Sequence, residues 1–126
     1  MSPRATVLIV EDNPLNRELV EAVLEPLGLE IRVAVDVPSG RAELARGRPD
    51  LILMDIDIPG GGGVLLLHEL RADPALAAVP VLAVTSFAMH GDRERFLAEG
   101  FDGYISKPID VATVVRTLQP FLPEAK

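Results

Sequence analysis

The sequence predicts an α/β fold built around a mostly parallel sheet, and two observations support it. Strand-like and helix-like segments alternate five times along the 126 residues, which is typical of repeated βα units. The central runs, Leu51–Met54 and Val81–Val84, are continuously apolar, as expected for strands buried on both faces. A chain of this length suits one core, so we expect a single domain over residues 1–126.

Five strands are expected where short apolar or β-branched runs are bounded by turn residues. The outer runs are shorter or more polar than the two central ones, so the central runs should form the middle of the sheet. The five predicted strands are Thr6–Val10, Ile31–Val35, Leu51–Met54, Val81–Val84 and Gly103–Ser106.

The first helix is expected to begin at Pro14, with Asn13 as its cap, and to end before Gly28. Its apolar residues repeat at helical spacing, which indicates an amphipathic helix. These residues are Leu15, Leu19, Val20, Val23, Leu24 and Leu27.

Three further helices are expected near Pro38–Arg46, Val64–Arg71 and Met89–Ala98. A fifth helix should follow Asp110, a suitable N-cap, and end at Pro120 and Pro123. We predict that one stripe of this helix is buried, formed by Val111, Val114, Val115, Leu118 and Phe121.

Composition narrows the functional classes. The net charge is −7 without a cluster of Lys or Arg, which argues against direct nucleic-acid binding and favours a protein partner. No apolar stretch approaches the roughly 20 residues of a membrane helix, so we expect no membrane insertion. The start of the chain lacks the pattern of a secretory signal, so a cytoplasmic location is expected. The absence of cysteine excludes disulfides and thiolate chemistry.

Four of the predicted strands stop at a reactive side chain. The first is followed by Glu11 and Asp12, the third by Asp55, the fourth by Thr85 and the last by Lys107. Because the carboxyl ends of parallel strands lie side by side, these side chains should converge where open α/β sheets bind ligands. Acids at helix starts and hydroxyls at strand ends are individually common, but the joint pattern favours a functional site.

The converging residues suit phosphoryl transfer. Mg²⁺ prefers oxygen ligands, and Asp12 and Asp55 can supply carboxylates, with Glu11 close by. Carboxylates form aspartyl-phosphate intermediates, so Asp55 is a candidate nucleophile. Lys107 would place a positive charge on the phosphoryl oxygens, and the Thr85 hydroxyl could donate a hydrogen bond to them.

These motifs resemble the receiver family of two-component response regulators. The resemblance rests on VLIVEDN at 7–13, DLILMD at 50–55 with Pro59 and Gly63 behind it, VTS at 84–86 and YISKP at 104–108. It implies the chemotaxis-regulator fold: a doubly wound five-stranded parallel sheet of order 2-1-3-4-5, with helices on both faces. The segment from residue 87 to 108 looks most like that of stand-alone regulators of bacterial cell-cycle and phosphorelay pathways.

The resemblance also implies roles for residues. Asp55 would be the phosphoacceptor, with Mg²⁺ held by Asp12, Asp55 and the backbone carbonyl of Asp57, and Glu11 assisting at the metal. Lys107 would contact the phosphoryl group, next to a cis Lys107–Pro108 bond. Thr85 would move toward the phosphate while Tyr104 turns inward. The implied partners are a sensor histidine kinase or phosphotransfer protein and a downstream protein target, and a phosphorylation-linked dimer stays open.

Two features depart from the family pattern. Four glycines, Gly60–Gly63, follow the acceptor, so we expect this loop to be unusually flexible. Asp57 and Phe87 occupy positions that tune the lifetime of the phosphoryl group in the family. An acid at 57 could orient attacking water and shorten that lifetime, whereas the bulky Phe87 could exclude water and lengthen it. His68 and His90 are interpreted as solvated helix residues away from the acidic cluster.

Two alternatives to a phosphorylated receiver remain. Asp55-Ile56-Asp57 after an apolar run also fits the first motif of haloacid-dehalogenase-type phosphatases, with Asp57 as acid/base. The upstream acidic pair and the lack of residues for a substrate cap argue against that function. The other alternative is an adaptor with a receiver fold that binds partners without phosphorylation.

Overall fold

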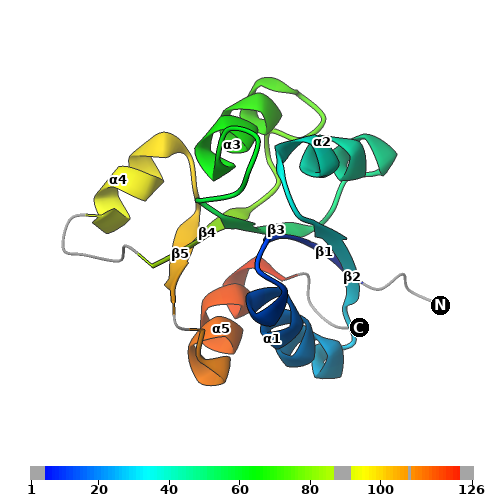
Figure 1. Cartoon of the computed structure of the whole chain (residues 1–126), viewed down its shortest axis with the longest axis vertical. Coiled ribbons are helices and arrows are strands. Elements are labelled where there is room, and N and C mark those ends of the chain that lie inside the picture. The colour runs from blue at the N-terminus through cyan, green and yellow to red at the C-terminus, as the bar shows by residue number, and fades with distance from the viewer. Residues whose placement is uncertain (1–4, 87–91, 108, 123–126) are drawn as a thin grey trace.

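The computed structural model describes residues 5–86, 92–107 and 109–122, and it confirms the predicted fold class. Five parallel strands form one sheet of order β2-β1-β3-β4-β5. Figure 1 shows α1 and α5 on one face of the sheet and α2, α3 and α4 on the other. No helix among the described residues has the length and apolar character needed to cross a bilayer.

The strands lie close to their predicted positions. They are β1 (Thr6–Val10), β2 (Glu30–Ala34), β3 (Leu51–Asp55), β4 (Val81–Thr85) and β5 (Gly103–Ser106). In β2 the predicted strand is shifted by one residue, because Val35 leaves the ladder and its N–H donates to the Ser39 hydroxyl at 2.9 Å. Ser39 also belongs to the capping box of the next helix, so capping ends the strand.

The helices are α1 (Pro14–Leu24), α2 (Val37–Arg46), α3 (Gly63–Ala72), α4 (Asp92–Glu99) and α5 (Val111–Leu118). Both predicted caps are present. The Asn13 side chain accepts hydrogen bonds from the N–H groups of Leu15 and Asn16, and Asp110 accepts from Thr113. Short 3₁₀ turns extend α1 and α5. The predicted start of the fourth helix at Met89 lies outside the described residues.

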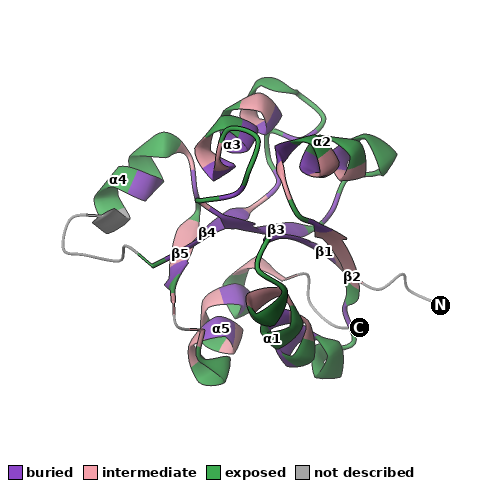
Figure 2. Ribbon diagram, viewed as in Figure 1, coloured by how far each residue is buried: buried purple, intermediate pink, exposed green. Residues whose placement is uncertain are grey.

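The core has two halves, one on each side of the sheet, and the buried strands run between them (Figure 2). Alternate residues of β1 face opposite halves: Val7 and Ile9 pack toward α1 and α5, while Leu8 and Val10 pack toward the other helices. Fully buried strands of this kind explain the continuous apolar runs of the central segments.

The first turns of α1 and α5 are more exposed than their apolar sequences suggest. Val111 is 55% exposed, so its predicted place in the buried stripe of α5 was wrong, whereas Val114 and Leu118 are fully buried. Leu15 is 75% exposed although it shares the helical spacing of the buried Val20. Both exposed residues lie in the first turn of a helix, beyond the carboxyl end of the sheet, where no layer covers them.

One arginine holds three segments together on the α3 side. The Arg71 guanidinium donates to the carbonyl oxygens of Ala77, Val79 and Gly100 at 2.6–3.1 Å. It also pairs with Asp102 at 2.9 Å, and that carboxylate accepts the N–H of Val81. The end of α3, the loop before β4 and the loop between α4 and β5 are therefore fixed by one side chain.

Arg71→Ala is expected to lower the free energy of unfolding by about 3 kcal/mol, because it leaves several carbonyl oxygens without their donor. Urea unfolding followed by circular dichroism measures this. Arg46→Ala is the matched control, since Arg46 is 71% exposed and pairs only on the surface with Glu43, and it should change stability by less than about 0.5 kcal/mol. Equal effects of the two substitutions would contradict the role of Arg71.

Candidate functional site

The carboxyl edge of the sheet brings together the reactive residues that follow β1 and β5 and those that end β3 and β4. Backbone hydrogen bonds extend the ladder past the strand ends and fix this edge. The Lys107 N–H donates to the Thr85 carbonyl at 2.8 Å, and the Glu11 N–H donates to the Ala34 carbonyl at 2.9 Å. Residues from widely separated parts of the sequence therefore lie at one rim.

Three acids form a tight cluster at this rim. One carboxylate oxygen from each of Glu11, Asp12 and Asp55 lies within 4.8 Å of the others. Glu11 and Asp55 are each only 3% exposed, whereas Asp12 is exposed. Crowded carboxylates repel one another, and an all-oxygen set with one open side is the kind of site that Mg²⁺ occupies. The donor set therefore fits a hard divalent cation.

Lys107 is the counter-ion of the two buried acids. Its Nζ lies 3.3 Å from Glu11 Oε1 and 3.3 Å from Asp55 Oδ2, and its side chain is 17% exposed. Burial acts to lower the pKa of Lys107, but the negative charges of Glu11 and Asp55 and hydrogen bonds to them outweigh burial and raise it. The ammonium therefore stays charged between two carboxylates.

The carboxyl group of Glu11 is the strongly perturbed acid of the cluster. Burial, followed by the adjacent Asp55 carboxyl, raises the pKa of Glu11 from 4.5 to about 7. The backbone N–H of Asn13, which donates to Glu11 Oε2 at 3.2 Å, and the charge of Lys107 act in the opposite direction but are weaker. Near neutral pH a proton and a metal ion would compete for this oxygen set.

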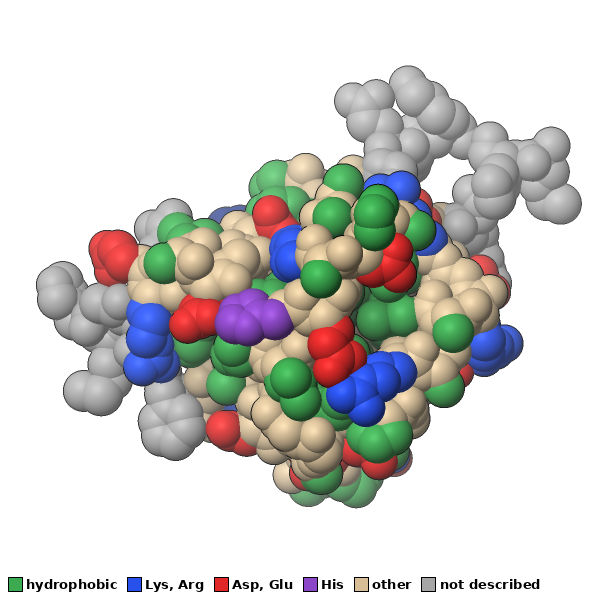
Figure 3. Space-filling view, turned by 90° about the horizontal axis from the view of Figure 1, so that it is seen from above, with side chains coloured by type: hydrophobic (Ala, Val, Ile, Leu, Met, Phe, Trp, Pro, Cys, Tyr) green, Lys and Arg blue, Asp and Glu red, His purple; other side chains and the backbone are tan. Residues whose placement is uncertain are grey.

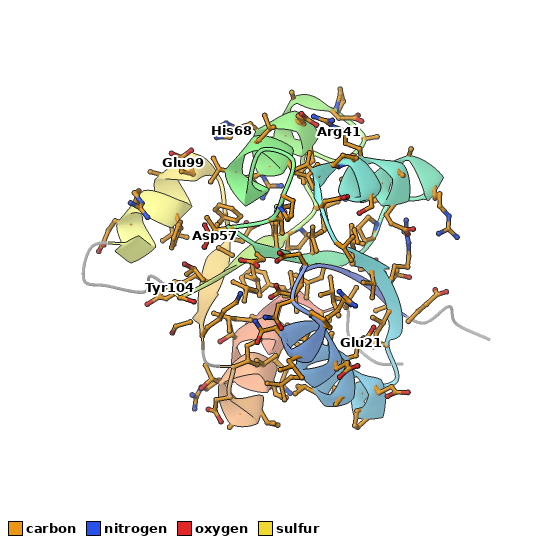
Figure 4. The ribbon with its side chains drawn as sticks, in the orientation of Figure 1. Glu21, Arg41, Asp57, His68, Glu99 and Tyr104 are labelled. Carbon is orange, nitrogen blue, oxygen red and sulfur yellow. The ribbon has the colours of Figure 1, made fainter. Side chains whose placement is uncertain are left out.

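The loop after β3 turns back tightly onto Asp55. The Asp57 N–H donates to Asp55 Oδ1 at 3.1 Å, while the Asp57 side chain is exposed (Figure 4). Gly60, Gly61 and Gly62 have φ values of 95°, 131° and 89°, which side chains rarely adopt. A Cβ on Gly63 would lie 2.4 Å from the Asp55 carbonyl oxygen. Glycine is therefore favoured at these four positions by backbone conformation or by lack of space. The expected extra flexibility of the loop stays a prediction.

Thr85 and Tyr104 lie on the neighbouring strands β4 and β5. Thr85 is 1% exposed and ends β4 beside Asp55. Tyr104 is half-buried and packs on the α4 side of the sheet, with its ring centroid 6.3 Å from that of Phe96 (Figure 4). The predictions on Phe87, His90 and the Lys107–Pro108 bond fall on residues 87, 90 and 108, outside the described residues.

Other polar contacts lie away from this rim, on the face formed by α2, α3 and α4. His68 was predicted to be a solvated helix residue; it is half-exposed, and its Nε2 lies 2.9 Å from Glu99 Oε2 on α4 (Figure 4). Arg41 and Glu69 form a two-pronged pair between α2 and α3 at 2.6–2.7 Å. Figure 3 shows this face, where a cavity of about 200 Å³ lies beside that pair.

Sequence reasoning missed one residue beside the acidic cluster. Arg17 Nη1 donates to the backbone carbonyl of Glu11 at 3.3 Å. The sequence places Arg17 one turn after the Asn13 cap, but periodicity fixes neither the rotation of α1 about its axis nor the Arg17 rotamer, so no sequence signal identified this contact.

Comparison with known proteins identifies the family. The response regulator receiver domain model matches residues 7–119. This chain belongs to the response regulator receiver family. This membership confirms the resemblance noted in the motifs and argues against the haloacid-dehalogenase alternative.

Named relatives and solved structures agree with this assignment. The receiver domain is 44% identical over 122 residues to the polar-differentiation response regulator DivK of Brucella anthropi, covering 95% of this chain and 98% of the relative. The chemotaxis response regulator CheY4 of Vibrio cholerae is 28% identical, with a TM-score of 0.88 and coverage of 95% and 100%.

A further similar structure contains a bound magnesium ion. It is the receiver domain of a sensor histidine kinase from Pseudomonas aeruginosa PAO1, which is 36% identical with a TM-score of 0.84 and covers 94% of this chain and 98% of that one. A magnesium ion is coordinated in the active site cleft of that protein.

We expect the metal-free receiver domain to lose up to about 3 kcal/mol of stability as pH rises from 4.5 to 7. In this window the folded molecule keeps the Glu11 proton that the unfolded chain has released, so a rising pH favours unfolding. Glu11→Gln removes this titration and should flatten the dependence. Urea unfolding of both proteins in EDTA from pH 5 to 8 measures the difference, and parallel profiles would contradict it.

Proposed function

We propose that this receiver domain accepts a phosphoryl group on Asp55 and signals through protein contacts. The observation that carries the proposal is the surroundings of the Asp55 carboxylate. It lies buried at the sheet edge, within 4.8 Å of two other acids and 3.3 Å from the ammonium of Lys107. A carboxylate held between a cation-binding set and a fixed ammonium suits transfer of an anionic group.

In the proposed reaction an Asp55 carboxylate oxygen attacks the phosphorus of a phosphohistidine donor. The new O–P bond forms as the P–N bond breaks, and the electron pair of that bond returns to the imidazole nitrogen, which takes a proton. Oδ1 accepts the Asp57 N–H and Oδ2 faces Lys107, so both oxygens are oriented before the donor arrives.

The same residues would hold the metal. Asp12, Asp55 and the backbone carbonyl of Asp57 would be the ligands, with Glu11 assisting beside them. Bound Mg²⁺ would neutralise negative charge on the phosphoryl oxygens. The exposed side chain of Asp12 leaves this side of the cluster open to solvent.

Lys107, Thr85 and Tyr104 would convert phosphorylation into a change of surface. A phosphoryl group on Asp55 offers oxygens to the Lys107 ammonium and the Thr85 hydroxyl, and movement of Thr85 would let Tyr104 turn inward. Shifting a population from 1:99 to 99:1 needs about 5.5 kcal/mol. Charge-assisted hydrogen bonds of roughly 1.5–3 kcal/mol each supply an energy of that size.

The proposed donor is a sensor histidine kinase or phosphotransfer protein in the cytoplasm, and the target is a further protein. The surroundings of the site support docking of a protein. Leu15 and Val111, both highly exposed, lie in the first turns of helices at the same edge as the acids.

We further propose that the chain works as a single receiver domain whose α4, β5 and α5 surface carries the signal. The proposal also includes a dimer of the receiver domain that forms on phosphorylation.

Asp55→Asn is expected to abolish covalent labelling, because the amide cannot act as the nucleophile. The wild-type chain is incubated with acetyl phosphate and Mg²⁺, and intact mass spectrometry measures the added phosphoryl mass. Asp73→Asn is the matched control and should be labelled like the wild type, since Asp73 is exposed at the end of α3, away from the carboxyl edge of the sheet. A wild-type chain that gains no mass, under conditions that label another receiver, would favour the adaptor alternative. Labelling of Asp55→Asn at the full rate would overturn the acceptor assignment.

Lys107→Ala is expected to retain Mg²⁺ binding but to lose switching. The ammonium competes with a cation for the same carboxylates, so its removal should not weaken metal binding. Loss of one charge-assisted hydrogen bond should lower the ratio of switched to unswitched molecules by about tenfold or more. NMR signals of Tyr104 with and without beryllofluoride measure switching, and Lys107→Arg is the charged control. Lost metal binding with intact switching would contradict these roles.

A further inference from the structure

Arg17 holds the backbone of the acidic loop from the side of α1. Its Nη1 donates to the Glu11 carbonyl oxygen at 3.3 Å, and its side chain is partly buried. The Glu11 N–H is held by the Ala34 carbonyl, and the Glu11 carboxylate accepts the Asn13 N–H. The backbone N–H, the carboxylate and the carbonyl of Glu11 thus each have a partner, and Arg17 supplies the one at the carbonyl.

The Glu11 carbonyl belongs to the peptide that joins Glu11 to Asp12. Glu11 is buried, so packing restricts its side chain directly. Asp12 is exposed, so the place of its carboxylate depends on the backbone that carries it. A donor that fixes this peptide therefore acts mainly on Asp12, which is the open side of the acidic cluster.

We propose that Arg17 is a positioning residue for the divalent cation: it fixes the Glu11–Asp12 peptide and thereby aims the Asp12 carboxylate at the cation site. This inference rests on the proposed function of the acidic cluster. Mutation of groups that orient metal ligands in this way commonly weakens metal binding by about 10–100-fold.

The charge of Arg17 alone predicts the opposite effect of its removal on Mg²⁺ affinity. Arg17 carries a positive charge beside a site for a cation, so simple repulsion would make its removal strengthen Mg²⁺ binding. Positioning predicts that its removal weakens binding, because Asp12 is no longer held in place. The direction of the change therefore separates the two effects.

The experiment measures the Mg²⁺ dissociation constant of the full chain by isothermal titration calorimetry, without any phosphodonor. Arg17→Met keeps a long apolar side chain but loses the donor and the charge, and it should weaken binding by about tenfold. Arg17→Lys keeps an N–H donor and should restore most of the affinity. Arg48→Met is the matched control, because it removes the same charge next to the start of β3, at the opposite edge of the sheet.

Hydrogen exchange adds a second readout. The amides of Asp12 and Asn13 should exchange faster in Arg17→Met, while the urea midpoint stays near that of the wild type. Unchanged or tighter Mg²⁺ binding by Arg17→Met, or equal weakening in Arg17→Lys, would overturn the inference. If the wild type binds Mg²⁺ and is labelled on Asp55, but Arg17→Met binds Mg²⁺ with the same affinity, then the positioning role of Arg17 fails and the proposed function stands. A wild type that binds no Mg²⁺ overturns the metal site and the inference together.

Discussion

The placement of one ammonium between two buried carboxylates is the interaction on which the site depends. Glu11 and Asp55 are almost fully buried at the sheet edge, and Lys107 Nζ lies at the same distance from each. Removing negative charge from water is costly unless a positive charge or a proton compensates it, and the pKa of Glu11 is raised to about 7 for this reason. Lys107 provides that charge in the metal-free molecule, so the acids can stay together before a cation or a phosphoryl group arrives.

The parallel sheet is what allows this arrangement. Glu11 and Asp12 follow β1, Asp55 ends β3, and Lys107 follows β5. Because the strands pair in parallel, Asp55 lies opposite Val84, next to the end of β4. The dry side of the cluster is the core itself, with Val10 and Met54 fully buried below it. Among the three clustered acids only Asp12 is exposed, so the cluster is open to solvent on the side of Asp12.

The sequence was most informative where local rules suffice. Apolar runs located all five strands, and the caps Asn13 and Asp110 located two helix starts, because both signals involve neighbouring residues. The convergence of Asp55 and Lys107 could also be expected, since parallel strands align their carboxyl ends. The exposure of Val111 could not, because it depends on how far each helix extends beyond the sheet.

Contacts that long side chains make across the fold could not be predicted from the sequence either. Arg71 reaches carbonyls in two loops, His68 reaches Glu99 on another helix, and Arg17 reaches the backbone of Glu11. Each contact depends on the rotation of a helix about its axis and on a rotamer, neither of which is fixed by periodicity. Sequence patterns therefore identified the groups of the site but not the residues that orient them.

The orienting contacts also restrict how a signal can leave the site. The C-terminal end of α4 is tied to α3 by His68 and by the Gly100 carbonyl bound to Arg71. Tyr104 lies against Phe96, a buried residue in the middle of α4, in the same half of the core. In the proposed switch, an inward turn of Tyr104 would change its contact with Phe96 while these contacts hold the end of α4. The arrangement favours reorientation of the helix about a fixed end over displacement of the whole helix.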